Sequence, residues 1–280
     1  MGCSTSLAVD ISAERRLHTF IDMLFDAYGK PTEQVGYTDG HYCLTKEDRD
    51  EAARCGSSLL YGEILAVGIT KLLDTEHLHA ARAQVLFDLG MGVGKLVMQA
   101  FLQYPNLKLI RGVELAYSRF KLAEEALLRL VSLQSDRFEV EERTPGEYIR
   151  VHTVGRRKRR ALELRRGDMW AVRDVSSCDI IVMHTELTPP AFPKFRRLVR
   201  QMKRGGRFVT YQDLSKHWPY SPPPFRQLEA NVDESDQFAT SWSALKGHHL
   251  YCWEKTAEYD RVASGSGELD LEESKEAIGQ

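Results

Sequence analysis

The sequence lacks the features that mark secreted, disulfide-stabilised or membrane-spanning chains. Its five cysteines are scattered, and no two stand at C-x-x-C spacing. This argues against a disulfide framework and a zinc site, and it favours a reducing compartment. No apolar run approaches the ~20 residues that would cross a membrane, and the N-terminus has no basic region followed by a long apolar stretch. We therefore expect no transmembrane helix and no secretory signal, and hence a protein that is not secreted.

A strong net charge is also missing, because 38 Lys and Arg nearly balance 40 Asp and Glu and leave a formal charge of −2. The balance hides local asymmetry, since a basic run near residue 157 contrasts with an acidic tail that begins at Glu268. Hydrophobic residues make up 42% of the chain, which is ample for a core. The length permits one large α/β domain or a domain with an added module.

The first six residues, Met1-Gly-Cys-Ser-Thr-Ser6, fit the N-myristoylation pattern M-G-x-x-x-[ST]. Gly2 would carry the myristoyl chain, and Cys3 beside it is a candidate for palmitoylation. One myristoyl chain binds a membrane weakly and reversibly, and a second acyl chain makes the binding stable. The alternative is a chance match within a flexible terminus.

Hydrophobic periodicity predicts an N-terminal group of helices over residues 12–28, 46–54 and 61–73. Strands then alternate with helices. The strands are predicted at 85–88, 108–113, 179–183, 207–211 and 248–253, and the helices from 94 onward, over 118–133 and over 194–202. A hairpin of 148–153 with 161–164 interrupts this order. The pattern predicts a Rossmann-like fold with a mostly parallel, doubly wound sheet and an N-terminal helical extension.

Four segments follow from this reading. They are a flexible N-terminus (1–10), a helical extension (11–60), the α/β domain (61–256) and an acidic tail (257–280). The tail is rich in Gly, Ser and acids and poor in large apolar residues, so we expect it to be disordered.

A glycine-spaced turn is the most informative motif. The apolar run from Val85 ends at Asp88, and Gly90, Gly92 and Gly94 follow. A dinucleotide fingerprint would need glycine at position 95, where Lys95 stands, and a phosphate-binding P-loop would need Ser or Thr at position 96. The remaining pattern, D-L-G-x-G-x-G, suits a ligand without a pyrophosphate. S-adenosylmethionine is the leading candidate.

Acidic residues at or just past the ends of successive predicted strands support this choice. Ligands of such sheets bind at the carboxyl ends of the strands. Glu114 is suited to accept hydrogen bonds from both hydroxyls of a ribose, and Asp88 to face the amino group of the methionine part. Asp168 would contact the adenine amino group. An aspartate after glycine is also a common turn former, so a purely structural turn is the alternative.

Methyl transfer from a sulfonium is an in-line displacement that depends on alignment and desolvation of the nucleophile. Alignment alone can supply about 7 kcal/mol or more. No metal or covalent intermediate is needed. We therefore expect no metal site. The chain also shows no obvious Ser-His-Asp or Cys-His arrangement of the kind that forms covalent intermediates.

Taken in order, six segments resemble the Dot1 family of non-SET histone-lysine methyltransferases, which have a class I fold. They are Tyr61-Gly-Glu63, the glycine turn 88–94, Gly112-Val-Glu114, Arg166-Gly-Asp168, Met202-Lys-Arg-Gly-Gly-Arg207 and Ser241-Trp242. The glycine turn is shared by most class I methyltransferases. The first and the last two segments make the narrower match, which runs from about residue 61 to residue 253.

The resemblance implies roles for individual residues. Tyr61, Gly62, Glu63 and Ile64 would form the loop that closes over the cofactor, and Trp242 would line the channel through which a lysine enters. The predicted cofactor site further includes Asp88, Gly90, Gly92, Gly94, Lys95, Glu114, Asp168 and Met169.

Three positions depart from the family pattern, and the second and third of them concern the acceptor side. Met91 stands where serine is usual. A Val-Asn-Asn-Phe segment is replaced by Val182-Met-His-Thr185, which puts His184 in place of an asparagine, and a tyrosine expected after Trp242 falls at His249. The two histidines are candidate bases at neutral pH, or they signal a different acceptor. An exposed strand residue is the alternative for His249.

Three functions remain open. The first is a protein-lysine methyltransferase that acts on a histone in the nucleus. The second is a methyltransferase tethered to the cytoplasmic face of a membrane, with another protein or a small molecule as acceptor. The third is a non-catalytic module that only binds the cofactor.

The basic run has several interpretations too. It would dock on nucleosomal DNA, act as a nuclear import signal, contact an anionic membrane, or form a solvated hairpin tip. Its residues are Arg156, Arg157, Lys158, Arg159 and Arg160.

Overall fold

The computed structural model describes residues 11–25, 39–155, 159–219, 221–228 and 237–256. Gly2 and Cys3, the central part of the basic run (156–158) and the acidic tail (257–280) lie outside these ranges. The expectations attached to them are therefore not tested by the fold.

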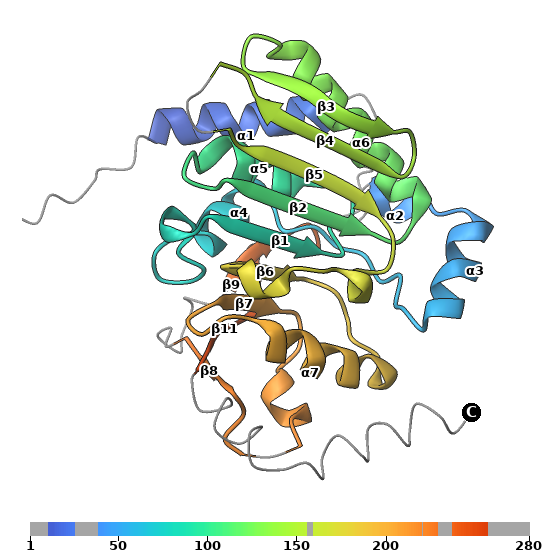
Figure 1. The fold of residues 1–280 in the computed structure, drawn as a ribbon, viewed down its shortest axis with the longest axis vertical. Coiled ribbons are helices and arrows are strands. Elements are labelled where there is room, and N and C mark those ends of the chain that lie inside the picture. The colour runs from blue at the N-terminus through green and yellow to red at the C-terminus, as the bar shows by residue number, and fades with distance from the viewer. Residues whose placement is uncertain (1–10, 26–38, 156–158, 220, 229–236, 257–280) are drawn as a thin grey trace, which may run out of the picture.

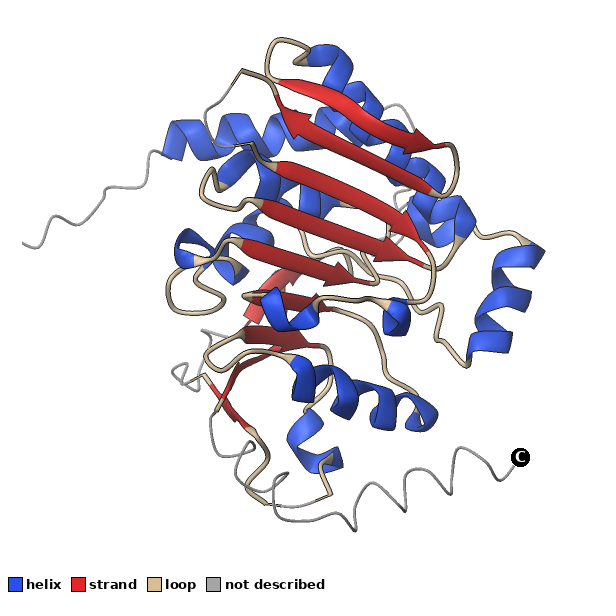
Figure 2. Cartoon of the chain, in the orientation of Figure 1, coloured by secondary structure: helices blue, strands red, loops and turns tan. Residues whose placement is uncertain are grey.

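A nine-stranded sheet forms the centre of the molecule, in the order β3-β4-β5-β2-β1-β6-β7-β11-β8 (Figures 1 and 2). Its five middle strands are parallel. They are β5 (Ala161–Arg166), β2 (Leu109–Glu114), β1 (Val85–Leu89), β6 (Ile180–Met183) and β7 (Arg207–Thr210).

Antiparallel strands extend both edges of this parallel core. On one side lie β4 (Tyr148–Thr153) and β3 (Phe138–Thr144), and on the other β11 (Tyr251–Lys255) and β8 (Phe225–Gln227). A separate two-stranded sheet pairs β9 (Gln237–Thr240) with β10 (Ser243–His249). The mixed, mainly parallel sheet confirms the predicted class I α/β fold.

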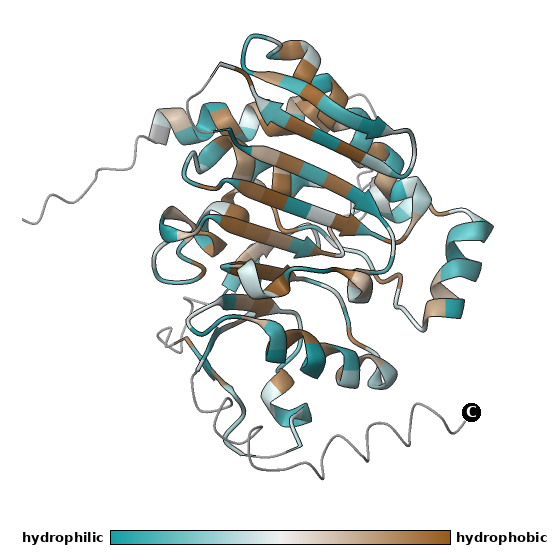
Figure 3. Ribbon diagram, viewed as in Figure 1, coloured by the Kyte–Doolittle hydropathy of each residue, from teal (hydrophilic) through white to brown (hydrophobic). Residues whose placement is uncertain are grey.

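Helices cover the two faces of the sheet unequally. One face carries α1 (Ile11–Phe25), α4 (Ala66–Leu72), α5 (Lys95–Gln103) and α6 (Tyr117–Leu133), whereas α7 (Phe192–Gln201) lies on the other face (Figure 1). Two short helices, α2 (Asp39–Tyr42) and α3 (Lys46–Cys55), precede α4. Each face buries its own apolar cluster, and Figure 3 shows the hydrophobic residues concentrated in the central strands.

Two predicted elements differ from the observed ones. The helix predicted over 61–73 begins only at Ala66, because Ile64 forms a bridge with Thr240 and Leu65 donates its N–H to the Ala239 carbonyl. The strand predicted over 248–253 is two strands, β10 and β11, interrupted at Leu250. In both places a long-range contact overrides the local pattern.

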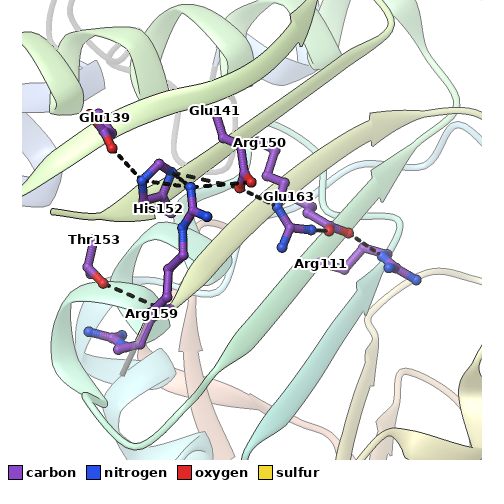
Figure 4. Close-up of polar contacts among 9 residues, drawn as sticks. Arg111, Glu139, Glu141, Arg150, His152, Thr153, Arg159 and Glu163 are labelled. Carbon is purple, nitrogen blue, oxygen red and sulfur yellow. Dashed lines mark hydrogen bonds and ion pairs between the residues drawn. The ribbon is translucent and has the colours of Figure 1, made fainter. Parts of the chain in front are cut away.

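In the described part of the chain, no helix covers the side of β2, β5, β4 and β3 that faces away from α5 and α6 (Figure 1). A row of paired charges crosses these strands instead (Figure 4). Arg111 Nε lies 2.7 Å from Glu163 Oε2, Arg150 also pairs with Glu163, and Arg150 Nε lies 2.7 Å from Glu141. A sheet face with such cross-strand pairs can stay in contact with water.

Arg160, the last residue of the basic run, does not belong to an exposed turn. Its side chain is buried, and its guanidinium donates to the carbonyls of Phe101, Tyr104 and Leu107 at and just beyond the end of α5. Two of these carbonyls, those of Phe101 and Tyr104, belong to the helix end, where carbonyls lack an intrahelical partner. The expectation that this side chain is available to phosphates is therefore wrong, and Arg160 acts as a cap for α5.

We predict that Arg160→Met lowers the free energy of unfolding by about 2–4 kcal/mol, because buried carbonyls lose their donor. Urea denaturation followed by circular dichroism measures the change. Arg159→Met is the matched control, since the Arg159 side chain is 58% exposed, and it should cost less than about 1 kcal/mol. Equal losses in the two variants would refute the capping role.

Candidate cofactor and acceptor site

A cavity opens at the carboxyl ends of β1, β2, β5 and β6, where the strand–helix connections diverge. Its volume is about 1190 Å³, part of it open to solvent, and residues 55–64, at the junction of the helical extension and the α/β domain, form one wall. All predicted cofactor residues line it except Gly94. Gly94 lies just behind the cavity as the N-cap of α5.

The glycine turn has the backbone that the sequence pattern predicts. Gly90, Gly92 and Gly94 all adopt positive φ, at +93°, +59° and +84°. Residues with a Cβ rarely adopt these angles. The turn leads directly into α5, whose first N–H groups point back toward the cavity mouth. Met91, where the family has serine, is buried with its sulfur against Gly112.

Glu114 ends β2 inside the cavity. Its side chain is buried, with Oε2 accepting from the Gly92 N–H at 2.9 Å and Oε1 accepting from the Ala116 N–H at 2.9 Å. Burial raises its pKa, although the nearby Arg119 acts in the opposite direction. Each oxygen keeps a further acceptor position. Glu114 can therefore brace the glycine turn and still receive two hydroxyl groups.

Asp88 is buried next to Glu114 in the neighbouring strand. Among the described residues its carboxyl group has no hydrogen-bond partner. Burial, together with the charge of Glu114, raises its pKa to about 8. A buried carboxyl without a partner matches a cationic ligand group, which would stabilise the carboxylate. The amino group of a bound methionine moiety fits this requirement.

Asp168 follows β5 and also lines the cavity. Its Oδ1 accepts from the Trp170 N–H at 2.9 Å and so caps the short 3-10 helix Met169–Ala171. The turn-forming role raised from the sequence is thus present. It leaves the second oxygen for a ligand, so Asp168 remains a candidate for the adenine contact.

Tyr61 stands over the glycine turn. Its ring lies within 3 Å of where a Cβ on Gly92 or on Gly40 would be. The Arg119 guanidinium covers the ring at 4.2 Å, and the hydroxyl donates to Glu63 Oε1 at 2.8 Å. The tyrosine therefore forms a fixed wall of the cavity.

Lys95 lines the cavity, but its charge is used within the protein. Its ammonium lies 2.6 Å from Glu63 Oε2 and 5.2 Å from the centre of the Phe25 ring. The Glu63 carboxylate is buried and thus links Tyr61 to Lys95. We assign Lys95 to holding the 61–64 loop on α5.

Two of the sequence motifs meet in space. Glu63 donates its N–H to Ser241 Oγ at 3.1 Å, and the Ser241 N–H donates to the Glu63 carbonyl at 2.8 Å. Trp242 packs on Gly62 so closely that a Cβ there would lie 2.0 Å from the indole ring. The loop on the cofactor side and the tryptophan on the acceptor side therefore form one unit.

We predict that Gly62→Ala displaces the indole of Trp242 and lowers the turnover number at least about 10-fold. Small displacements near reacting groups have effects of this size or larger. The same protein should bind cofactor within about threefold of wild type. Tryptophan fluorescence and steady-state kinetics measure the two effects. Ser132→Ala is the control, because Ser132 is exposed on α6 and does not line the cavity. Unchanged turnover in Gly62→Ala would contradict the packing argument.

Aromatic rings gather beside the cavity. His184, which lines it, stacks on Trp242 with ring centres 5.5 Å apart and an interplanar angle of 7°. Tyr211 meets His184 edge to face and stacks on His248 at 5.0 Å. Trp242 and His248 are also edge to face at 5.3 Å. These four residues are called the ring cluster below.

His249 is not a member of the ring cluster. Its ring contacts Tyr251 at 4.5 Å, and among the described residues it has no ring contact with the cluster. The neighbouring His248 occupies the place predicted for it. The cause is a register shift in the β9–β10 pairing between Ser243 and His248. Counting along the sequence from Trp242 does not account for this irregularity.

Sequence reasoning missed Arg119, Tyr211 and His248. Tyr211 directly follows β7, so the strand-end rule that selected Asp88 and Glu114 would also have found it. Arg119 is buried in α6 and donates to the carbonyls of Gly40 and Leu59. Nothing in its local sequence sets it apart from a surface arginine.

Within the described residues there is no cluster of histidine, cysteine or acidic side chains with the geometry of a metal site. Over the same part of the chain, no helix is long and apolar enough to cross a membrane.

A nucleotide cavity at the strand ends, with buried acids on two adjacent strands and a glycine turn between them, defines a class I methyltransferase. Residues 26–141 match the family model "Histone methylation protein DOT1", and this match supports a Dot1-like methyltransferase fold with S-adenosylmethionine as the cofactor. The match includes Tyr61, the glycine turn and Glu114, and ends before Asp168 and Trp242.

No curated protein matches the chain. Similar solved structures include an RNA methyltransferase from Salinibacter ruber in complex with S-adenosylhomocysteine (19% identity, 68% of this chain and 90% of that one, TM-score 0.38). A putative O-methyltransferase from Klebsiella pneumoniae (11%, 88% and 100%, TM-score 0.43) and a putative RNA methyltransferase from Pyrococcus horikoshii (12%, 88% and 97%, TM-score 0.43) are further examples. At these identities and TM-scores the likeness says nothing about the acceptor.

Proposed function

We propose that this methyltransferase transfers the methyl group of S-adenosylmethionine to the side-chain amine of a protein lysine, with a histone as the acceptor. The observation that carries the proposal is the ring cluster beside the cavity, held to the cofactor loop through Gly62 and Trp242. Aromatic faces accommodate the alkyl stem of lysine and attract its ammonium group. The Dot1 match supports the choice of a histone.

When bound, S-adenosylmethionine supplies an electrophilic methyl group on a sulfonium sulfur. Glu114 would hold the ribose hydroxyls, and Asp88 the amino group of the methionine part. Asp168 and Met169 would flank the adenine. Tyr61 to Ile64 would cover the ligand and exclude water, and alignment of this kind accounts for much of the rate of a displacement reaction.

The proposed partner is the nucleosome, which would place the protein in the nucleus. The basic run would contact DNA phosphates through Arg156, Arg157, Lys158 and Arg159. Arg160 is left out because its guanidinium is buried. Phosphate contacts of this kind weaken steeply as salt rises, so binding to nucleosomes should fall accordingly.

A second candidate is a methyltransferase tethered to the cytoplasmic face of a membrane, with a different protein or a small molecule as acceptor. The motif at Gly2 and Cys3 favours it. Imaging of the wild type against Gly2→Ala tests the tether. We expect membrane signal that the substitution abolishes, and identical distributions would discard this candidate.

Incubation of the purified chain with labelled S-adenosylmethionine and nucleosomes, free histones or cell lysate separates the candidates. Label on a histone lysine supports the proposal. Label only on other molecules refutes the histone assignment and supports the second candidate. Cofactor binding without any transfer would indicate a non-catalytic module, and no cofactor binding would refute all of these.

A further inference from the structure

His184 lines the cavity one strand away from Asp88, the residue proposed to hold the amino group of the methionine part. It follows β6, in which Val182 is paired with Asp88 of β1. The next residue, Thr185, lies 3.7 Å from where a Cβ on Gly90 would be. Asp88, Val182 and His184 all line the cavity. If Asp88 binds the amino group of the methionine part, the methyl end of that part lies toward His184.

The two nitrogens of the His184 ring have different surroundings. Nε2 is buried without a hydrogen-bond partner. Nδ1 also has no partner among the described residues, yet it is not one of the buried unpartnered atoms. His184 is partly exposed and lines the cavity. Nδ1 is therefore the nitrogen on the accessible part of the ring.

A neutral imidazole carries its proton on one ring nitrogen only, and the hydrogen bond made by the other nitrogen decides which one. Tyr211 meets the imidazole edge to face and Trp242 is stacked on it, and the buried Nε2 has no hydrogen-bond partner. Nδ1 is the nitrogen that a ligand in the cavity can reach. A donor that binds Nδ1 therefore fixes the proton on Nε2 and uses the lone pair on Nδ1.

We propose that His184 accepts through Nδ1 a hydrogen bond from the N–H of the acceptor amine, and thereby turns the lone pair of that amine toward the methyl group. The inference rests on the proposed function, since it concerns an amine acceptor. In this role, His184 determines how many methyl groups the acceptor nitrogen can receive.

His184 does not act as the base in this arrangement. Burial lowers its pKa to about 4, with a smaller contribution from His248. A free lysine has a pKa of about 10.4, so the ring cannot take the proton of an ammonium. The acceptor loses that proton to water before it reacts. Its nitrogen then forms the N–C bond while the S–C electron pair returns to sulfur, and the positive charge passes from sulfur to nitrogen.

A limit on the product follows. A primary amine and a monomethylated amine each keep at least one N–H for Nδ1 while the lone pair attacks. A neutral dimethylated amine has no N–H left. The products should therefore be monomethyl- and dimethyl-lysine, with little or no trimethyl-lysine.

Two experiments test the inference. In protein labelled with ¹⁵N-histidine, the His184 ring is assigned by comparison with His184→Phe and followed from about pH 5.5 to about pH 8. We expect a neutral ring protonated at Nε2 throughout. Protonation at Nδ1, or titration within this range, would overturn the proposal whether or not an acceptor is known.

In the second experiment, proteins of a cell lysate are incubated with labelled S-adenosylmethionine and hydrolysed, and the methylated lysines are separated. Wild type should give mono- and dimethyl-lysine. His184→Phe should lower kcat/KM about 30-fold with cofactor affinity within about twofold, and His184→Asn should restore part of the rate through its side-chain oxygen. His249→Phe is the matched control and should behave as wild type.

The outcomes are distinguishable. Trimethyl-lysine formed by the wild type as readily as dimethyl-lysine would overturn the inference and leave the lysine acceptor intact. Equal rates in His184→Phe and His249→Phe would also overturn it. Wild-type protein that labels no lysine at all would refute the proposed function itself.

Discussion

Replacement of Glu114 by alanine should weaken S-adenosylmethionine binding about 100-fold. Two hydrogen bonds from the ribose hydroxyls to a buried carboxylate are lost, and bonds to charged groups contribute about 1.5–3 kcal/mol each. The substitution also frees the N–H groups of Gly92 and Ala116, which loosens the glycine turn. Isothermal titration calorimetry measures the affinity.

The matched control for this prediction is Glu142→Ala. Glu142 is an exposed carboxylate on β3, at the far edge of the sheet. The Glu142→Ala protein should bind S-adenosylmethionine with the same affinity as wild type. An unchanged affinity in Glu114→Ala would refute the assignment of Glu114 to the ribose. It would also refute the assignment of the cavity to S-adenosylmethionine.

The second large effect is expected at Asp88, whose pKa burial raises to about 8. Below that pH the free protein carries a protonated Asp88, and a cationic ligand group favours its ionised form. Binding therefore releases a proton, and the association constant should rise up to about tenfold per pH unit below pH 8 and level off above it. Asp88→Asn cannot titrate and should lose both affinity and this slope.

The stability of the ligand-free protein should change in the opposite sense. Asp88 has a higher pKa in the folded protein than its ordinary value of 3.8. The folded state thus binds more protons than the unfolded state between about pH 4 and about pH 8, so the free energy of unfolding falls as pH rises through this window. Asp88→Asn should lack this contribution and melt higher than wild type at pH 8. Parallel melting curves of the two proteins across this range would contradict the assignment.

The cofactor side of the site could be predicted because its signals are local. The glycine turn, Asp88 and Glu114 lie within 27 consecutive residues, and the rule that ligands bind at strand ends brings them together. The mostly parallel, doubly wound sheet follows from the alternation of strands and helices. Even here, the pairing of Lys95 with Glu63 could not be foreseen, since it depends on how the 61–64 loop folds back onto α5.

The acceptor side is assembled from segments far apart in sequence, and prediction was weaker there. The ring cluster joins residues that follow β6 and β7 to residues of the β9–β10 sheet. His184 and Trp242 were found through the resemblance to a family. His248 was missed in favour of His249, because a register shift within a strand pairing changes which side chain faces inward.

The basic run shows a limit of a different kind. Five consecutive basic residues suggest one exposed surface, yet Arg160 is buried against the end of α5. Composition cannot reveal that one member of such a run caps a helix, because the carbonyls that it binds lie more than 50 residues away in the sequence. Strand β3 was missed for a related reason, since all but its first residue are exposed and no apolar alternation marks it.

The most direct test of the central claim is a crystal structure of the protein with S-adenosylhomocysteine bound. The account predicts the ribose hydroxyls on Glu114, the amino group beside Asp88, and the sulfur facing His184 and Trp242. Density for the ligand outside this cavity, or in it with the ribose away from Glu114, would contradict the account.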